Sequence, residues 1–218
     1  MPNLFNTSAQ NLHSTERAMN ASSNFMNRKI LLFGGTFAPI HVGHLILAEW
    51  AWEQYGFEEV VLLPAGDPPH KEGEWDAAFR LELVKRATAD NPHFRVDDFE
   101  MVHNGPSYTL TTLEHYHKEN PEKEIYFLMG EDSLRDFHKW HAYEKLLHMA
   151  HFLIARRDRD QAADAIMQSY VEKGAKMEYL DSSYLDISST MIRSRLASGK
   201  SIRYLVPESI RGFFEGHK

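Results

Sequence analysis

Short apolar runs alternate with longer amphipathic segments along most of the chain. The apolar runs, and one segment of alternating polarity, predict strands at 29–33, 59–64, 94–102, 124–129, 151–155 and 176–180. The longer segments predict helices at 42–55, 75–89, 110–119, 143–149, 160–173, 189–197 and 208–214. Because strands and helices alternate, we expect a parallel sheet covered by helices on both faces. The predicted fold class is α/β: a Rossmann-like, doubly wound parallel sheet in a single domain with short C-terminal helices.

The same pattern locates the ligand-binding edge of the sheet. In doubly wound sheets, ligands bind beyond the carboxyl ends of the strands, near the point where the strand order switches. The unusual residues of this chain gather in segments that follow predicted strands, at 34–44, 64–71, 103–109, 130–140, 155–157 and 181–193. We therefore expect these segments to build the functional site.

Composition narrows the classes of function. The chain has 218 residues, of which 43% are hydrophobic and 25% are charged, as in an ordinary globular protein. We predict one domain at 28–218, preceded at 1–27 by a polar segment that is typical of a flexible tail. The net charge of −7 argues against a nucleic-acid partner, because such proteins need a basic face. The absence of cysteine and of any membrane-spanning apolar run leads us to expect a cytoplasmic protein without a membrane partner, with homo-oligomerisation left open.

The segment after the first predicted strand has the features of a phosphate-binding loop. Gly34 and Gly35 allow backbone N–H groups to approach an anion closely. His41 and His44 lie three residues apart at the start of a helix, so they share one face, and the helix N-terminus favours negative charge. Gly43 carries no side chain between them, which leaves room for a phosphate. The pattern predicts a triphosphate site.

Other interpretations of this loop are weaker. The loop could also be a buried histidine pair or an ordinary helix start. The occurrence of two histidines together with the glycines favours the phosphate-binding interpretation over both. A metal site would need a third ligand, and none stands out. Gly199-Lys200-Ser201 resembles the end of a Walker loop, but it follows a helix, and Ser194 stands where the first glycine is required. The chain has no dinucleotide fingerprint of the Gly-x-Gly-x-x-Gly type.

A second candidate phosphate segment opens the predicted helix at 189–197. Ser188 is a good helix N-cap, and Ser189 and Thr190 add hydroxyls beside the amides of a helix start. Arg193 lies one turn further on, where its planar guanidinium can reach phosphate oxygens. An ordinary capped helix with a surface arginine would have the same sequence. The prediction of a phosphate site at this segment is stronger because the histidine loop occurs in the same chain.

Together the two segments resemble the signature pair of the nucleotidylyltransferase superfamily, a His-x-Gly-His loop and an Ile-Ser-Ser-Thr-x-x-Arg segment. More closely, the chain is similar to bacterial nicotinate-nucleotide adenylyltransferases over almost everything after Lys29. The likeness includes the segments Pro68-Pro69-His70-Lys71, Pro106-Ser107-Tyr108-Thr109, Gly130-Glu131-Asp132-Ser133-Leu134, Phe137-His138-Lys139-Trp140 and Tyr204-Leu205-Val206-Pro207. Sister families fit less well. Pantetheine-phosphate adenylyltransferases typically have Thr at the place of His41 and Lys at the place of Arg193, and flavin-synthesising relatives lack the Pro-Pro-His-Lys segment.

The resemblance implies transfer of AMP from ATP to nicotinate mononucleotide, with Mg²⁺ bound through the ATP phosphates and few or no protein metal ligands. It implies catalytic roles for His41, His44 and Arg193. The expected ATP-binding residues are Gly34, Gly35, Thr36, Phe37, Gly43, Gly130, Asp132, Ser188, Ser189 and Thr190. Asp132 would hold a ribose hydroxyl, or cap a helix at 133–137, or do both.

For the mononucleotide, the resemblance points to Lys71, Thr109 and Trp140. Trp140 would stack on the pyridine ring, and Thr109 with its neighbouring amides would receive the pyridine carboxylate. The remaining tryptophans are expected in the core, and two arginines of the 75–89 helix at the surface: Trp50, Trp52, Trp75, Arg80 and Arg86.

Two positions depart from the family pattern. Ala38 stands where the family usually has Asp or Asn, so a local hydrogen bond that would brace the loop is lost. Thr111 stands where the family usually has an acidic residue, beside the expected mononucleotide site. Two rival functions stay open: a sister nucleotidylyltransferase with another phosphorylated acceptor, and a nucleotide-binding regulator without turnover, which is the rival that the two departures favour.

Overall fold

Six parallel strands form one sheet in the computed structural model, which describes residues 29–66, 75–102, 107–156 and 161–214. The strands are β1 (Lys29–Gly35), β2 (Glu59–Pro64), β3 (Phe94–Val96), β4 (Glu124–Gly130), β5 (His151–Ala155) and β6 (Lys176–Tyr179). Their order is β3-β2-β1-β4-β5-β6, and each neighbouring pair is parallel. This is the order of a doubly wound sheet, with its switch point between β1 and β4. The predicted fold class is confirmed.

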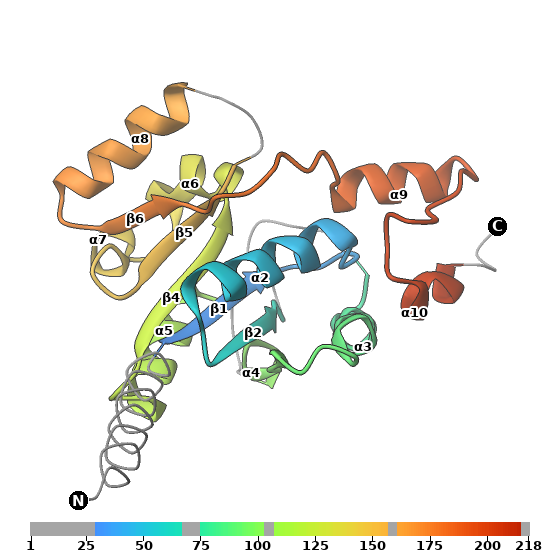
Figure 1. The fold of residues 1–218 in the computed structure, drawn as a ribbon, viewed down its shortest axis with the longest axis horizontal. Helices are drawn as coiled ribbons and strands as arrows, with labels where there is room; N and C mark the ends of the chain where they lie inside the picture. Colours follow the sequence, from blue (N-terminus) through green and yellow to red (C-terminus); the bar gives the residue numbers. More distant parts are fainter. Residues whose placement is uncertain (1–28, 67–74, 103–106, 157–160, 215–218) are drawn as a thin grey trace, which may run out of the picture.

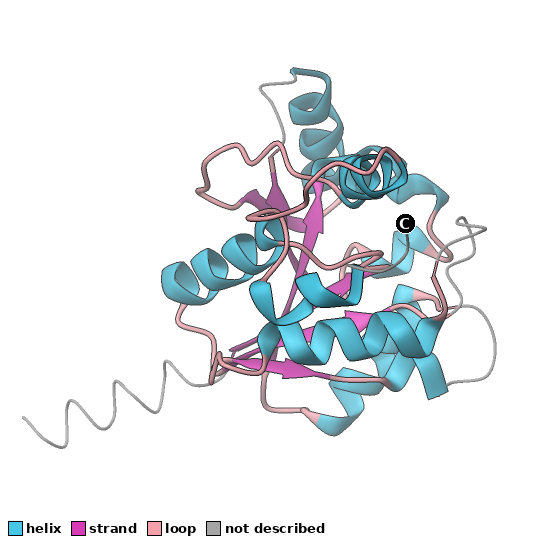
Figure 2. Cartoon of the chain, turned by 90° about the vertical axis from the view of Figure 1, so that its right-hand side faces the viewer, coloured by secondary structure: helices cyan, strands magenta, loops and turns pink. Residues whose placement is uncertain are grey.

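Helices cover both faces of the sheet (Figures 1 and 2). They are α2 (Val42–Tyr55), α3 (Ala77–Thr88), α4 (Phe99–Val102), α5 (Thr109–Glu119), α6 (Glu131–Asp136), α7 (Tyr143–Leu146), α8 (Gln161–Glu172), α9 (Ser189–Ala197) and α10 (Glu208–Arg211), with 3₁₀ turns η1 (Phe137–Lys139) and η2 (Gly212–Phe214). The alternation of side chains along β1 separates two buried clusters. Leu31 and Phe33 pack with α2, α3, α9 and α10, whereas Ile30 and Leu32 pack with α5 to α8. Both faces of β1 are therefore apolar, as expected of a central parallel strand.

Most predicted elements agree with the structure, and the predicted strand at 94–102 is the main error. Only Phe94–Val96 forms β3, and the chain then turns into the short helix α4. The Asp97 carboxylate accepts a hydrogen bond from the Phe99 N–H at 2.9 Å, a local side-chain bond that competes with strand pairing. The helix predicted at 143–149 is also shorter, because α7 ends at Leu146. The predicted tail at 1–27 lies outside the described residues.

The C-terminal helices stand beyond the carboxyl end of β1. In Figure 1 the chain leaves β6, crosses the top of the sheet and reaches α9, which lies beside the first turn of α2. A backbone hydrogen bond of 3.0 Å from the Val42 N–H to the Leu205 carbonyl fixes the segment after α9 to the start of α2. Residues far apart in sequence thus meet at the switch point of the sheet.

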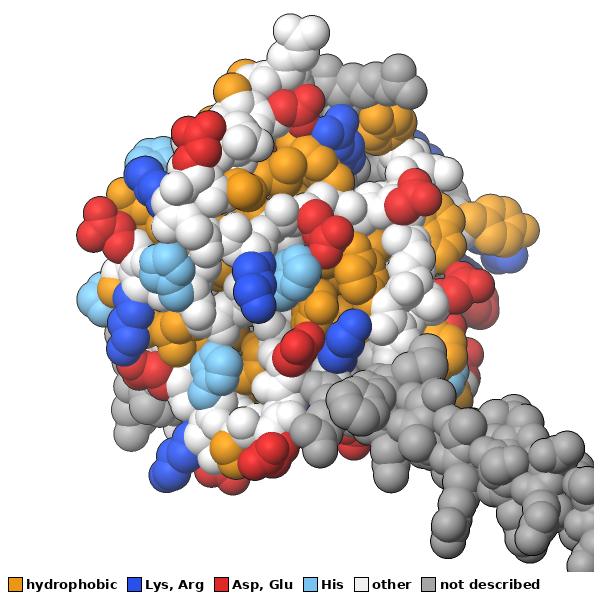
Figure 3. Space-filling model, turned by 60° about the vertical axis from the view of Figure 1, so that its left-hand side comes forward, with side chains coloured by type: hydrophobic (Ala, Val, Ile, Leu, Met, Phe, Trp, Pro, Cys, Tyr) orange, Lys and Arg blue, Asp and Glu red, His pale blue; other side chains and the backbone are white. Residues whose placement is uncertain are grey.

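Charged side chains of both signs are interspersed on one face of the molecule (Figure 3). On the face shown in Figure 3, lysines and arginines lie singly among acidic side chains and histidines and form no continuous basic stripe. Among the described helices, none combines the length and apolar character that a bilayer-spanning helix requires.

Candidate active site

Two adjoining cavities lie at the switch point, and the turn at the end of β1 lines both. The larger has a volume of about 730 Å³ and the smaller about 390 Å³. Gly34, Gly35 and Thr36 belong to the lining of each. We call the larger one the phosphate cavity and the smaller one the acceptor cavity. Two ligands bound in them would meet across this short stretch of backbone.

The phosphate cavity brings together every residue that the sequence assigned to catalysis or to ATP. Besides the shared turn, its lining includes Phe37, Ala38, His41, Gly43, His44, Gly130, Asp132, Ser188, Ser189, Thr190 and Arg193. These residues come from the loop after β1 and the first turn of α2, from the junction of β4 and α6, and from the start of α9. Arg193 thus lies on the same side of the sheet as both histidines, which is the arrangement that a shared polyphosphate requires.

The two histidines form a stacked pair at the beginning of α2. His41 occupies the N-cap position and His44 the third helical position, with ring centroids 3.6 Å apart and ring planes 21° apart. The His41 N–H donates to Nδ1 of His44 at 3.2 Å, so neutral His44 carries its proton on Nε2 as a donor. A Cβ at Gly43 would lie 3.1 Å from Nδ1 of His41, tighter than most such contacts, so glycine is the residue that best accommodates the close ring pair.

The Phe37 ring packs against His44 of this pair, and the Phe37 backbone is strained. Its φ of 48° lies in the left-handed region, which a bulky L-residue rarely adopts. Its buried ring meets His44 edge-on at a centroid distance of 5.1 Å and Phe33 at 5.5 Å. Gly35 leaves space for the ring, since a Cβ there would lie 3.1 Å from it. The strained residue therefore fixes the plane of a candidate catalytic imidazole.

The start of α9 is hydrogen-bonded to the loop that precedes α2. Ser188 caps the helix by accepting from the Met191 N–H at 3.1 Å. The Ser189 hydroxyl donates to the Pro39 carbonyl at 2.9 Å, and Nη1 of Arg193 donates to the Ala38 carbonyl at 2.6 Å. The two phosphate segments predicted from sequence are thus held together by the protein itself.

The acceptor cavity contains Thr109 and Trp140, as the sequence analysis expected, together with residues it did not assign. Its lining also includes Ala65, Glu100, Ser107, Tyr108, Phe127, Lys139, His141 and Leu146. The half-buried Trp140 ring is braced by Phe137 at 5.1 Å and by Phe127 at 6.1 Å. Lys71 lies outside the described residues.

Tyr108 and His141 form a second aromatic pair in this cavity. Their rings stack at a centroid distance of 4.6 Å, and each residue directly precedes or follows one of the predicted ligands, Thr109 and Trp140. The family-like segments contained Tyr108, but nothing local in the sequence indicates that it meets His141. Both residues line the acceptor cavity, so their two flat rings form part of its wall.

The half-buried Glu100 lies between the acceptor cavity and α5. The Thr112 hydroxyl donates to Oε1 of Glu100 at 2.7 Å. Burial raises the pKa of the Glu100 carboxyl, although the bond from Thr112 acts in the opposite direction. The Ser107 hydroxyl joins the neighbouring backbone, accepting from the Gly66 N–H at 3.0 Å and donating to the Glu100 carbonyl at 3.3 Å.

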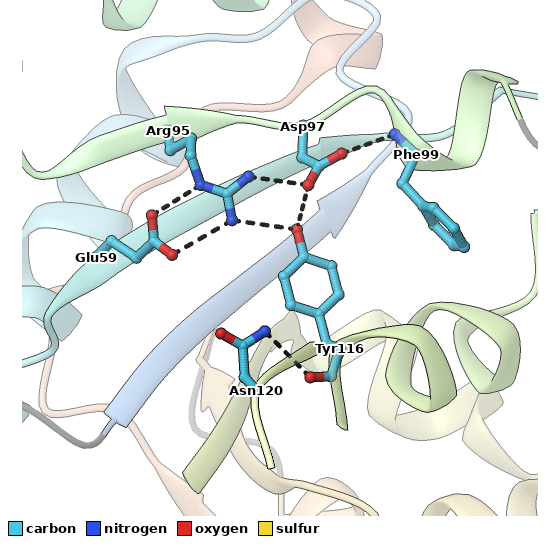
Figure 4. A network of polar contacts seen from close by, with 6 residues as sticks. All are labelled: Glu59, Arg95, Asp97, Phe99, Tyr116 and Asn120. Carbon is cyan, nitrogen blue, oxygen red and sulfur yellow. Dashed lines mark hydrogen bonds and ion pairs between the residues drawn. The ribbon is translucent and has the colours of Figure 1, made fainter. Parts of the chain in front are cut away.

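An ion-pair network holds α4, and therefore Glu100, in position (Figure 4). Asp97 accepts from the Tyr116 hydroxyl at 2.6 Å, from Arg95 at 2.9 Å and from the Phe99 N–H at 2.9 Å. Burial alone would raise the pKa of Asp97, but these donors outweigh it and hold the pKa below its usual value. The network ties β3, α4 and α5 together beneath the acceptor cavity.

Four further residues bear on expectations from the sequence. Arg80 is 2% exposed, so its expected surface position is wrong, whereas Arg86 is exposed as expected. Asp132 does not cap a helix at 133–137, because α6 begins at Glu131 with Gly130 as its N-cap. Gly199 follows α9 with a φ of 64°, which supports its interpretation as a helix stop rather than a phosphate loop.

The described residues contain no group of three or more His, Asp or Glu side chains that could hold a metal ion. His41 and His44 alone provide too few ligands for a closed protein site. A divalent cation that arrives with a nucleotide would be held chiefly by phosphate oxygens.

Comparison with known proteins agrees with this architecture. The family model described as cytidylyltransferase-like matches residues 32–195, which span both candidate phosphate segments. The fold and the site therefore define a nucleotidyltransferase of the cytidylyltransferase-like class.

A protein of Desulfitobacterium hafniense, described as "Probable nicotinate-nucleotide adenylyltransferase", is 42% identical over 193 residues, 86% of this chain and 93% of its own. One from Synechococcus, with the same description, is 40% identical over 88% of this chain and 94% of its own. The chain belongs to the family of nicotinate-nucleotide adenylyltransferases.

Solved structures show the same fold at lower sequence identity. A Plasmodium falciparum nicotinic acid mononucleotide adenylyltransferase complexed with NaAD has a TM-score of 0.71 and 20% identity, covering 85% of this chain and 96% of its own. A Vibrio parahaemolyticus protein, described as a putative nicotinate-nucleotide adenylyltransferase, has a TM-score of 0.62 and 20% identity, covering 86% of this chain and 98% of its own.

Proposed function

We propose that the protein transfers the AMP group of ATP to nicotinate mononucleotide, giving nicotinate adenine dinucleotide and pyrophosphate. The family of the chain supports this assignment. The observation that carries it is the pair of cavities joined by Gly34, Gly35 and Thr36, because a transfer between two bound substrates needs adjoining sites. We expect the reaction in the cytoplasm with small-molecule substrates.

The chemistry proposed for the phosphate cavity is a direct displacement. A 5′-phosphate oxygen of the acceptor attacks the α-phosphorus of ATP, and the bond from that phosphorus to the bridging oxygen breaks to release pyrophosphate. The acceptor phosphate is already anionic near neutral pH, so no strong general base is needed. The contribution of the protein is then positioning and stabilisation of charge.

Four side chains are proposed to stabilise that charge. His41 and His44 donate to the α- and β-phosphate oxygens as negative charge moves toward the leaving group. Arg193 holds the β- and γ-phosphates, with one edge of its guanidinium bonded to the Ala38 carbonyl. Lys71 is proposed to assist. Mg²⁺ bound to the ATP phosphates would supply further charge neutralisation.

The acceptor cavity is proposed to recognise the pyridine mononucleotide. Trp140 stacks on the pyridine ring, and Thr109 with neighbouring amides receives the carboxylate. Asp132, in the first turn of α6 and in the lining of the phosphate cavity, binds a ribose hydroxyl of ATP. Trp140 lines the same cavity as the shared turn, so a flat aromatic acceptor could stack on its ring beside that turn.

A pyrophosphate-release assay with a panel of acceptors tests the assignment. The panel contains nicotinate mononucleotide, nicotinamide mononucleotide, phosphopantetheine and flavin mononucleotide, each with ATP and Mg²⁺. We expect the highest kcat/KM with nicotinate mononucleotide and a dinucleotide product of the corresponding mass. Greater turnover with phosphopantetheine or the flavin would identify a sister transferase. Tight ATP binding without turnover of any acceptor would identify a regulator.

A further inference from the structure

Arg80 is a buried cation whose guanidinium donates hydrogen bonds to three backbone carbonyl groups. It lies in the first turn of α3 and is 2% exposed. Its Nη1 donates to the Thr36 carbonyl at 2.7 Å, its Nη2 to the Gly66 carbonyl at 3.1 Å and its Nε to the Trp75 carbonyl at 2.9 Å. One side chain therefore joins the loop after β1, the loop after β2 and the segment that enters α3.

Such a placement is costly unless the guanidinium is well hydrogen-bonded. Removing a charge from water is unfavourable, and a buried arginine persists where fixed dipoles replace its hydration. The fork of the guanidinium presents its donors in one plane, so it can span several carbonyls at once. An ammonium group on a lysine stem has one donor centre and cannot match these three separate acceptors.

The most informative of the three acceptors is Thr36. It belongs to the turn that lines both cavities, and the next residue, Phe37, has the left-handed φ of 48°. In a trans peptide the carbonyl and the N–H point in opposite directions. A bond that fixes the Thr36 carbonyl therefore also fixes the direction of the Phe37 N–H, at a residue whose backbone is strained.

Three carbonyl groups of the loop after β1 accept hydrogen bonds from side chains of α3 and α9. Arg80 of α3 holds Thr36, Arg193 of α9 holds Ala38 and Ser189 of α9 holds Pro39. The two bonds from α9 lie on the side of the phosphate cavity, where both of their donors are lining residues. Arg80 holds the opposite end of the loop and links it to Gly66, which follows Ala65 of the acceptor cavity.

We propose that Arg80 is a positioning residue for the transfer reaction, which holds the Thr36–Phe37 peptide between the two cavities and thereby aligns the acceptor phosphate with the α-phosphorus of ATP. The proposal rests on the proposed function. Because misalignment of bound reactants affects the chemical step more than binding, loss of Arg80 should lower kcat more than it raises either KM.

The first test compares Arg80→Lys and Arg80→Ala with Arg86→Lys, a matched control on the exposed face of α3, where Arg86 pairs with Glu82. We expect Arg80→Lys to lower kcat by roughly 100-fold, with both KM values within about threefold of wild type. Addition of guanidinium should restore part of the turnover of Arg80→Ala, and Arg86→Lys should behave as wild type. Wild-type kcat in Arg80→Lys would overturn the proposal, as would equal losses in kcat and in the folded fraction measured by circular dichroism.

The second measurement does not depend on turnover. Hydrogen exchange of the peptide covering residues 33–38 should be roughly tenfold faster in Arg80→Lys than in wild type, and unchanged in Arg86→Lys. Unchanged exchange in Arg80→Lys would overturn the holding role even if activity fell. If the wild-type protein released no pyrophosphate with any acceptor, the proposed function would fail, and the exchange result would still decide whether Arg80 holds the loop.

Discussion

The Arg193 guanidinium donates to the Ala38 carbonyl at 2.6 Å and so joins segments that lie 155 positions apart in the chain. The Ser189 hydroxyl adds a second bond to Pro39. Hydrogen bonds of the protein itself therefore fix the histidine loop to the start of α9. Donors that are already in place need no reorganisation when charge develops, which is the main advantage of a preorganised site.

Replacement of Arg193 by lysine should separate its two roles. A lysine keeps the positive charge but cannot bind a phosphate and the Ala38 carbonyl with one planar fork. We expect Arg193→Lys to lower kcat by roughly 10²–10³, with a smaller rise in the KM for ATP. Steady-state kinetics give both values, and Arg195→Lys, on α9 but outside the lining of both cavities, is the control. Retention of half the wild-type turnover would remove Arg193 from the reaction.

His44→Ala should affect turnover far more than nucleotide binding. The lost donor acts as charge moves toward pyrophosphate, a change worth about 3–4 kcal/mol for comparable donors. Isothermal titration with a non-hydrolysable ATP analogue, combined with single-turnover kinetics, separates the two effects. His148→Ala, at an exposed position outside both cavities, serves as the control. Similar turnover in His44→Ala and wild type would contradict the mechanism.

Trp140→Ala should weaken the acceptor rather than ATP. Loss of a stacking partner costs about 1–3 kcal/mol, so we expect the KM for nicotinate mononucleotide to rise by roughly 5- to 150-fold. Trp140→Phe should recover part of this loss, because a smaller ring still stacks. Measurement of both KM values decides the role, and a larger effect on the KM for ATP would refute stacking.

Gly66→Ala should disturb the acceptor cavity through a backbone clash. A Cβ at Gly66 would come too close to the Glu100 carbonyl oxygen, and that contact is to backbone rather than to a flexible side chain. We expect a loss of about 1–3 kcal/mol in the free energy of unfolding and a higher acceptor KM. Gly212→Ala is the matched control, since a methyl group added there would meet nothing within 4 Å. Equal stability of both variants would show that α4 moves aside.

Tyr116→Phe should reveal a pH-dependent part of the stability. Its hydroxyl helps to hold the pKa of Asp97 below the usual value, so ionised Asp97 stabilises the fold above its unfolded pKa of about 3.9. That contribution is lost as the pH falls through the lower folded pKa. We expect Tyr116→Phe to lose about 1.5–3 kcal/mol at pH 7 and clearly less in strong acid. Urea unfolding at both pH values tests this, with Tyr184→Phe, at an exposed position, as the control.

Local sequence signals predicted much of this molecule. The bounds of α2, β2, β5 and α9 follow from apolar periodicity and helix caps, which act over a few residues. The phosphate cavity was also predictable, because strands that run parallel bring their carboxyl ends to one edge. The turn at Asp97 was missed, since a single side-chain bond there ends the strand earlier than its alternation suggested.

The remaining features depend on contacts that no local pattern contains. Arg80 looks like a surface residue in an amphipathic helix, and only the folded chain shows that its three acceptors surround it. The stack of Tyr108 on His141 joins the segment before α5 to the segment before α7, which only the tertiary structure brings together. Such residues require the tertiary structure for their interpretation.

The shared turn between the two cavities also bears on what happens after the reaction. In the proposed reaction each substrate occupies one cavity, but the dinucleotide is a single molecule that spans both. Its two halves are covalently linked, so each raises the effective concentration of the other at its own subsite. The product must therefore leave both cavities in one event, and its departure, rather than the bond exchange, is the step expected to limit repeated turnover.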